Sequence, residues 1–136
     1  MISNTMNSGN EIIKKLQMTL HSEGGHFKES YRDNYVSLIY YLLKKGEKSH
    51  WHRLTKNETL HFYSGDPLQV YMSDDEINVS LFEIGKENNF HYTINAGTWF
   101  AMKSVGNYSL IGCTVAPAFD YKDFELAPPN WLPGKK

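Results

Sequence analysis

The chain has 136 residues, 40% of them hydrophobic, and its 14 Lys and Arg against 15 Asp and Glu leave a formal net charge of −1. Without a basic stripe or a run of about 20 apolar residues, the sequence predicts neither nucleic-acid binding nor a membrane helix. The length suits one domain, residues 1–136, with one hydrophobic core.

The only cysteine, Cys113, has no partner for an internal disulfide, and the polar residues 1–10 lack the pattern of a secretory signal. Disulfides are rare in reducing compartments, where single thiols persist. We therefore expect a cytoplasmic protein.

Residues 8–20 form the predicted helix at the start of the chain. Ser8 and Glu11 have the spacing of an N-terminal capping box. Apolar side chains follow at helical spacing: Ile12, Ile13, Leu16 and Leu20. Because this apolar face is narrow, the helix is expected to pack on the outside of a larger body.

From residue 25 the pattern changes to short runs rich in Tyr, Phe, Val and Thr, separated by turn-forming residues. Strands are predicted near residues 26–32, 36–43, 49–54, 59–63, 67–72, 77–82, 90–94, 98–103 and 108–115. This regular spacing predicts an all-β antiparallel sandwich or barrel, such as a jelly roll, over about residues 25–127. The proline-containing tail, residues 128–136, is expected to wrap the surface irregularly or to fray.

Residues 23–32 alternate charged and aromatic side chains along a predicted strand. Successive side chains of a strand point to opposite faces. One face is predicted to carry Phe27, Glu29 and Tyr31, and the other His26, Lys28, Ser30 and Arg32. The pattern fits a solvated edge strand as well as one wall of a binding site.

Histidines and a glutamate are concentrated in one segment: His50, His52, Glu58 and His61. His50 and His52 are predicted to share one face of a strand with Leu54, and Glu58 follows after a turn. Imidazole titrates near neutral pH and binds metals, so this cluster predicts a site for proton transfer or metal binding. A lone histidine on a strand is an ordinary surface or packed residue, but three with a glutamate favour a site.

Two further residues are open to two interpretations each. Trp99 follows a turn at residues 95–97 and is expected either to floor a ligand pocket or to belong to the core. Cys113 lies in the apolar run 110–115, which favours a buried, unreactive thiol over a nucleophile.

The spacing of these residues resembles the cupin superfamily. Its first motif is Gly, five residues, His-x-His, three or four residues, Glu, six residues, Gly. Gly46, His52, Glu58 and Gly65 all match it, whereas Leu54 replaces the second His.

The second cupin motif is matched less well. Gly97 fits it, but Asn95 replaces the motif's proline and Phe100 replaces its histidine. More narrowly, the chain resembles a small uncharacterised cupin family through residues 22–32, 52–54, 61–67, 97–99 and 112–126, within a match over about residues 11–127. The resemblance implies an antiparallel double-stranded β-helix (an RmlC-like jelly roll), a homodimer, and kinship with metal-free sugar-nucleotide epimerases such as dTDP-4-dehydrorhamnose 3,5-epimerase.

The expected function is therefore a metal-independent epimerase or isomerase of a small anionic or sugar-like metabolite. His52 is the expected base, with Glu58 orienting it. The acid is expected among His61, Tyr63 and Tyr121. Substrate contacts are expected from Lys28, Arg32, Arg53, Trp99 and Tyr121, an arginine being suited to bind phosphate or carboxylate through two hydrogen bonds.

Two alternatives stay open. A divalent metal held by His50, His52 and Glu58 would support oxygenase chemistry, which needs three protein ligands and an open position. A barrel with a polar-rimmed pocket can also bind a metabolite without converting it. In each case a homodimer is expected, formed through the helix and the strand at 26–32.

Overall fold

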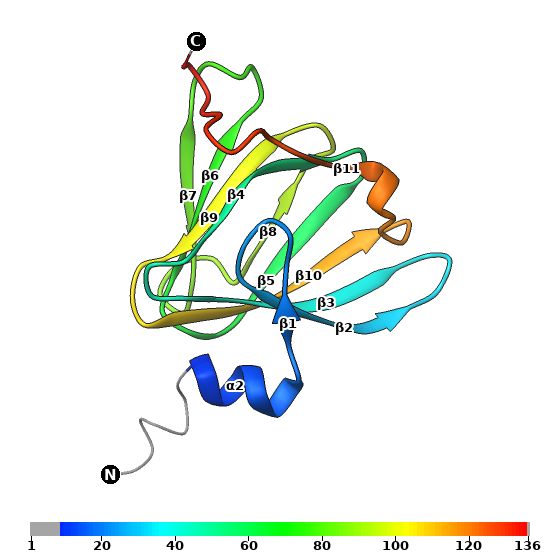
Figure 1. Cartoon of the computed structure of the whole chain (residues 1–136), viewed down its shortest axis with the longest axis vertical. Helices are drawn as coiled ribbons and strands as arrows, with labels where there is room; N and C mark the ends of the chain where they lie inside the picture. Colours follow the sequence, from blue (N-terminus) through cyan, green and yellow to red (C-terminus); the bar gives the residue numbers. More distant parts are fainter. Residues whose placement is uncertain (1–8, 136) are drawn as a thin grey trace.

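The computed structural model describes residues 9–135 as two antiparallel β-sheets that face each other (Figure 1). The six-stranded sheet has the order β1 (Thr19–Leu20), β2 (His26–Arg32), β3 (Ser37–Lys44), β10 (Tyr108–Ala116), β5 (Asn57–Gly65) and β8 (His91–Ile94). The five-stranded sheet has the order β11 (Phe124–Leu126), β4 (Lys48–Leu54), β9 (Trp99–Ser104), β6 (Leu68–Ser73) and β7 (Ser80–Ile84). The predicted all-β jelly roll is confirmed, with the two sheets as separate ladders rather than one closed barrel.

All the predicted strands are confirmed, as β2 to β10, with ends that differ from the predicted ones by at most three residues. The short strands β1 and β11 were not predicted. They contain two and three residues, which is too short for side-chain alternation to be visible in the sequence.

The N-terminal helix α2 (Gly9–Leu16) ends earlier than predicted. Gln17 has a φ of 56°, and the Met18 N–H donates to the Ile13 carbonyl at 2.9 Å, an arrangement that stops a helix. Leu20 belongs to β1 instead and is exposed. The Ser8 capping box lies outside the described residues, and no helix within residues 9–135 has the length and apolar character of a membrane span.

The helix packs on the outer face of the six-stranded sheet, as predicted (Figure 1). The main core lies between the two sheets and draws side chains from both of them. Its buried members are Tyr41, Leu43, Leu60, Leu68, Val70, Ile84, Ile94, Phe100, Met102, Ile111 and Cys113. Alternation along each strand sends every second side chain into this layer.

Two irregularities in the ladders change which side chains face the inside. One lies in β2, where the register with β3 shifts between Glu29 and Tyr31. The other lies in β4, where the register with β9 shifts between Ser49 and His52. An extra residue in one strand reverses the faces of all residues beyond it, so the predicted faces of both strands hold only in part.

The C-terminal segment wraps the surface, which is one of the two expectations for it. Trp131 packs against Trp99 and Trp51, with ring centroids 4.8 and 6.1 Å apart. These tryptophans form a cluster on the outer face of the five-stranded sheet, together with Ala127.

A tight turn at residues 21–25 joins β1 to β2 and packs against β4. The His50 N–H donates to the Glu23 carbonyl at 2.7 Å. Gly24 has a φ of 112°, and a Cβ there would lie 2.3 Å from the Lys48 carbonyl oxygen. Only glycine therefore allows the turn to approach β4 so closely.

Replacing Gly25 by alanine tests the packing of this turn. Gly25 has a φ of 77°, and an added Cβ would lie 2.9 Å from the Leu42 carbonyl oxygen. Gly46 has a similar φ of 83° but nothing within 4 Å of an added Cβ, so Gly46→Ala is the matched control. We expect Gly25→Ala to lower the free energy of unfolding by about 1–3 kcal/mol more than the control does, measured by urea denaturation. Equal losses would show that the turn tolerates the side chain.

Candidate functional site

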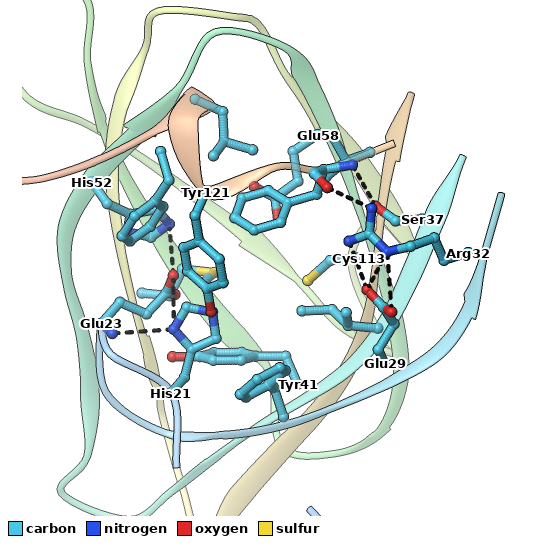
Figure 2. Close-up of a pocket in the computed structure, with 17 residues that line it drawn as sticks. His21, Glu23, Glu29, Arg32, Ser37, Tyr41, His52, Glu58, Cys113 and Tyr121 are labelled. Atoms are coloured by element: carbon cyan, nitrogen blue, oxygen red, sulfur yellow. Dashed lines mark hydrogen bonds and ion pairs between the residues drawn. The ribbon is translucent and has the colours of Figure 1, made fainter. Parts of the chain in front are cut away.

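A cavity of about 220 Å³ lies between the two sheets (Figure 2). Strands of both sheets line it, and residues 119–124 border it. Its mouth lies at Arg32 and Tyr121, which are partly exposed. Most of the remaining wall is apolar, so the few polar groups inside it are poorly solvated.

One end of the cavity holds an acid between two imidazoles: Glu23, His52 and His21 (Figure 2). Glu23 Oε1 lies 3.3 Å from His52 Nε2 and 3.6 Å from His21 Nδ1. His52 comes from β4, whereas the other two residues come from the turn. Residues 29 positions apart are thus brought together by the packing of this turn against β4.

Hydrogen bonds fix the protonation of both rings. His52 Nδ1 lies 2.8 Å from the His50 carbonyl oxygen, which can only accept, so Nδ1 carries the proton. His52 Nε2 is then a free base facing Glu23. In His21 the assignment is reversed, because Nδ1 accepts from the Glu23 N–H at 3.1 Å.

Burial keeps these groups neutral. It lowers the pKa of His52 from 6.5 to about 3 and the pKa of His21 to about 4. Burial and the nearby charge of Glu58 raise the pKa of Glu23 well above its usual value. His52 Nε2 and His21 Nδ1 both direct lone pairs toward Glu23 Oε1, so a proton on that oxygen fits the two contacts. We therefore assign the cluster as a carboxylic acid beside two uncharged imidazoles rather than as an ion pair.

Glu58 enters the same cavity from β5, on the other sheet. It is 9% exposed, and its side chain interacts with the thiol of Cys113. Burial raises the pKa of Glu58 from 4.5 to about 7 and raises that of Cys113 as well. His52 and Glu58 thus line one cavity as expected, but the carboxyl group next to His52 is that of Glu23.

The mouth of the cavity holds an ion pair. Arg32 donates to both oxygens of Glu29, the shortest contact being 2.8 Å, and to the Phe119 carbonyl at 2.7 Å. The shift of register in β2 turns Arg32 toward the cavity, on the side of Phe27 and Glu29, contrary to the predicted face. Of the expected acids, Tyr121 is at this mouth, and its hydroxyl points toward His21 (Figure 2).

His61 and Tyr63 do not line the cavity, which corrects the expectation that either is the acid. Leu60 of the same strand points into the core, so its neighbours point to the outer face of the six-stranded sheet. There His61 Nε2 lies 3.0 Å from Thr114 Oγ1, and the Tyr63 ring lies against Gly112.

Three expected substrate contacts also lie elsewhere. Lys28 is exposed and does not line the cavity. Arg53 stacks on Trp99 at 4.4 Å and pairs with Glu125 at 2.9 Å, on the outer face of the five-stranded sheet. Trp99 therefore belongs to the tryptophan cluster under the C-terminal segment and does not floor the pocket.

The expected metal triad is not assembled. The shift of register in β4 turns His50 away from His52, and its Nε2 lies 2.8 Å from the Pro128 carbonyl oxygen. At the remaining positions of the cupin motifs, Leu54 lines the cavity and the Phe100 ring packs 4.1 Å from the His52 ring. Within residues 9–135 no three His, Cys, Asp or Glu side chains are placed to hold a metal ion, so the donor set does not fit one.

Sequence reasoning missed His21, Glu23 and Tyr41 as members of the site. The Tyr41 hydroxyl donates to the Gly24 carbonyl at 2.5 Å and so holds the turn against β3. The available signal was the Glu23-Gly24-Gly25 sequence, because paired glycines permit a close approach that carries the preceding acid inward.

A protein-family model described as "Cupin superfamily (DUF985)" matches residues 10–127. No curated protein matches the chain. A solved structure from Shewanella oneidensis is 33% identical, with a TM-score of 0.86 over 90% of this chain and 85% of its own. A hypothetical protein from Leishmania major is 28% identical, with a TM-score of 0.83 over 92% of this chain and 90% of its own.

More distant structures share the fold alone. Oxalate decarboxylase from Bacillus subtilis is 12% identical, with a TM-score of 0.67 over 79% of this chain and 29% of its own. At this identity the likeness concerns the jelly roll and says nothing about the reaction.

Nuclear magnetic resonance can test the protonation of the two buried rings. We expect the ¹⁵N shifts of His52 to show a proton on Nδ1, and those of His21 a proton on Nε2, with both rings neutral from pH 8 down to pH 5. The His52→Gln variant assigns the signals. Protonation of either ring above pH 6 would contradict the assigned burial effect.

Replacing Glu58 by glutamine should make stability depend differently on pH. The pKa of Glu58 is 4.5 in the unfolded chain and about 7 in the native protein. At pH values between these two, the native state therefore binds more protons at Glu58 than the unfolded state does. Ionising Glu58 at higher pH therefore costs the native state about 3 kcal/mol, which glutamine avoids.

We subtract the free energy of unfolding of the wild type from that of Glu58→Gln at each pH. We expect this difference to rise by about 3 kcal/mol from pH 4.5 to pH 8. The difference is needed because the lowered pKa values of His21 and His52 give the wild type an opposing trend. Urea unfolding at several pH values measures it, with the exposed Glu87→Gln as control. A difference that is independent of pH would show that burial does not raise the pKa of Glu58.

Proposed function

The chain belongs to the DUF985 family of the cupin superfamily, and from that premise we propose that it binds a small sugar-like metabolite in the cavity and isomerises it by metal-independent proton transfer. The observation that carries the proposal is the neutral acid–base pair, Glu23 and His52, 3.3 Å apart and buried at the end of a cavity. A sugar is favoured over an anion because Glu29 neutralises Arg32, which among residues 9–135 is the one Lys or Arg side chain that lines the cavity.

The proposed chemistry is enolisation, the first step of both isomerisation and epimerisation. A substrate placed against the pair gives a proton from the carbon next to its carbonyl to His52 Nε2, and its carbonyl oxygen takes the proton of Glu23. The C–H bond breaks, a C=C bond and an O–H bond form, and no net charge enters the cavity. The resulting imidazolium and carboxylate attract each other strongly, because the surroundings are poorly polarisable.

The second half of the reaction returns both protons. His52 delivers its proton to the former carbonyl carbon. Glu23 recovers a proton from the hydroxyl on the carbon that was deprotonated first, and that carbon becomes the new carbonyl. The pair ends as it began. Epimerisation instead needs a proton from another side chain of the cavity, and the candidates are Glu58 and Tyr121.

Binding without conversion remains the second candidate function. The low pKa of His52, about 3, supports simple binding, because so weak a base removes a carbon-bound proton slowly. Conversion requires that Glu23 protonate the carbonyl oxygen of the ligand in the same step. The cavity would serve either function, so the exchange of carbon-bound protons is the property that separates them.

Two further expectations stay predictions. A homodimer through α2 and β2 is supported by Leu20, which is 75% exposed, and by the short β1, which pairs with only the first two residues of β2. A cytoplasmic location is supported by the free Cys113.

Deuterium exchange tests the proposed function. Aldoses, ketoses and 2-amino sugars are incubated with the protein in D₂O, and ¹H NMR follows the loss of the proton next to the carbonyl. We expect exchange with the wild type and a loss of about 100-fold or more in His52→Gln. His50→Gln is the matched control, because His50 lies outside the cavity and bonds to Pro128. Equal rates of deuterium exchange with the wild type and with His52→Gln would refute the proposal.

A further inference from the structure

Glu58 is a buried carboxyl group without a counter-charge. It is 9% exposed, lines the cavity, and has the neutral thiol of Cys113 as its side-chain partner. No Lys, Arg or His side chain within residues 9–135 forms an ion pair with it. A thiol is a weak donor, so a carboxylate here lacks both a charge partner and strong hydrogen bonds.

The rest of the cavity does not supply the missing charge. Glu23 is a second acid, near enough for its charge to be felt at the same site, and its imidazole neighbours are neutral. Arg32 is matched by Glu29 at the mouth. The lining residues therefore carry no excess positive charge, and ionisation of Glu58 leaves the cavity negative.

We propose that the ligand of this cavity carries a protonated amino group, which Glu58 binds as a carboxylate. The inference deepens the proposed function and rests on it: the sugar-like metabolite is an amino sugar or a related amino carbonyl compound. The amino group then supplies the positive charge that the protein itself lacks. Hydrogen bonds between ionised partners in a poorly solvated site are about twice as strong as neutral ones.

The arrangement of the cavity fits such a ligand. Glu58 extends from one sheet, and the Glu23–His52 pair occupies the other end of the cavity (Figure 2). A 2-amino sugar can place its ammonium group at the first site and its carbonyl at the second. Its reaction is then epimerisation, because the carbon next to its carbonyl carries no hydroxyl that could become a new carbonyl. With Glu58 ionised, Tyr121 is the candidate for the second proton donor. An ammonium group next to a carbonyl also withdraws electrons from the carbon between them, which makes that C–H proton more acidic.

An organic ammonium is favoured over a metal ion as the cation. A metal ion needs about three protein ligands, and residues 9–135 provide no such group of His, Cys, Asp or Glu side chains. An ammonium group needs only one carboxylate, with its other protons bonded to water or to the ligand's own hydroxyls.

Binding of a cation must also release protons, which gives a direct measurement. Glu58 has a pKa of about 7 in the empty cavity, so about 0.9 of the molecules hold its proton at pH 6 and about 0.1 at pH 8. A bound ammonium ionises Glu58 and expels that proton. A neutral sugar has no reason to do so.

Isothermal titration calorimetry, in buffers of different ionisation enthalpy, counts the released protons. The probes are D-glucosamine and methylammonium, with D-glucose as the neutral match. We expect both amines to bind with release of about 0.9 proton at pH 6. At pH 8 methylammonium should release about 0.1 proton, whereas D-glucosamine should take up protons on balance, because its own amino group is largely unprotonated at that pH. Glu58→Gln should weaken amine binding more than tenfold, whereas Glu125→Gln, at a carboxylate on the outer face, should leave it unchanged.

The outcomes separate this inference from the proposed function. Equal binding of D-glucosamine and D-glucose without proton release would overturn the inference and leave the proposed function intact. Proton release on adding Zn²⁺ or Mn²⁺ alone, lost in Glu58→Gln, would overturn it in favour of a metal. If no probe binds and no sugar exchanges deuterium, both fail. His52→Gln should lose exchange yet keep proton release, because it leaves Glu58 in place.

Discussion

The site depends on one close packing contact, that of the turn at residues 21–25 against β4. Glu23 reaches the inside of the protein because its neighbour Gly24 has no side chain to collide with the Lys48 carbonyl. The His50 N–H then holds the Glu23 carbonyl at 2.7 Å, and Tyr41 holds Gly24 from the other side. Without this contact His52 would face an apolar cavity with no acid beside it.

Burial then decides the chemistry of the groups that the contact brings together. Charges are costly between the sheets, so imidazoles lose their protons and carboxyls keep theirs. The result is a free imidazole base and an acid 3.3 Å apart. The same cost applies to Glu58, so a positive charge in the cavity would favour the ionised form of its carboxyl group.

Side-chain alternation explains both the successes and the errors of the site prediction. It correctly places Phe27 and Glu29 on one face of β2. Beyond the shifts of register, however, it gives Arg32 and His50 the wrong faces. A bulge of one residue leaves no mark in composition or periodicity, because it is set by the pairing of two strands rather than by one strand's sequence.

The sequence by itself determined the all-β fold and most of its strands, since hydrophobic alternation and turn residues are local properties. It also singled out His52 and Glu58, through motif spacing that is likewise local. Only the tertiary structure decided that Glu23, 29 positions before His52, is the acid beside it, and that His61, Tyr63 and Trp99 face away from the cavity. These facts depend on strand register and on the packing of one turn, which arise between distant segments when they meet.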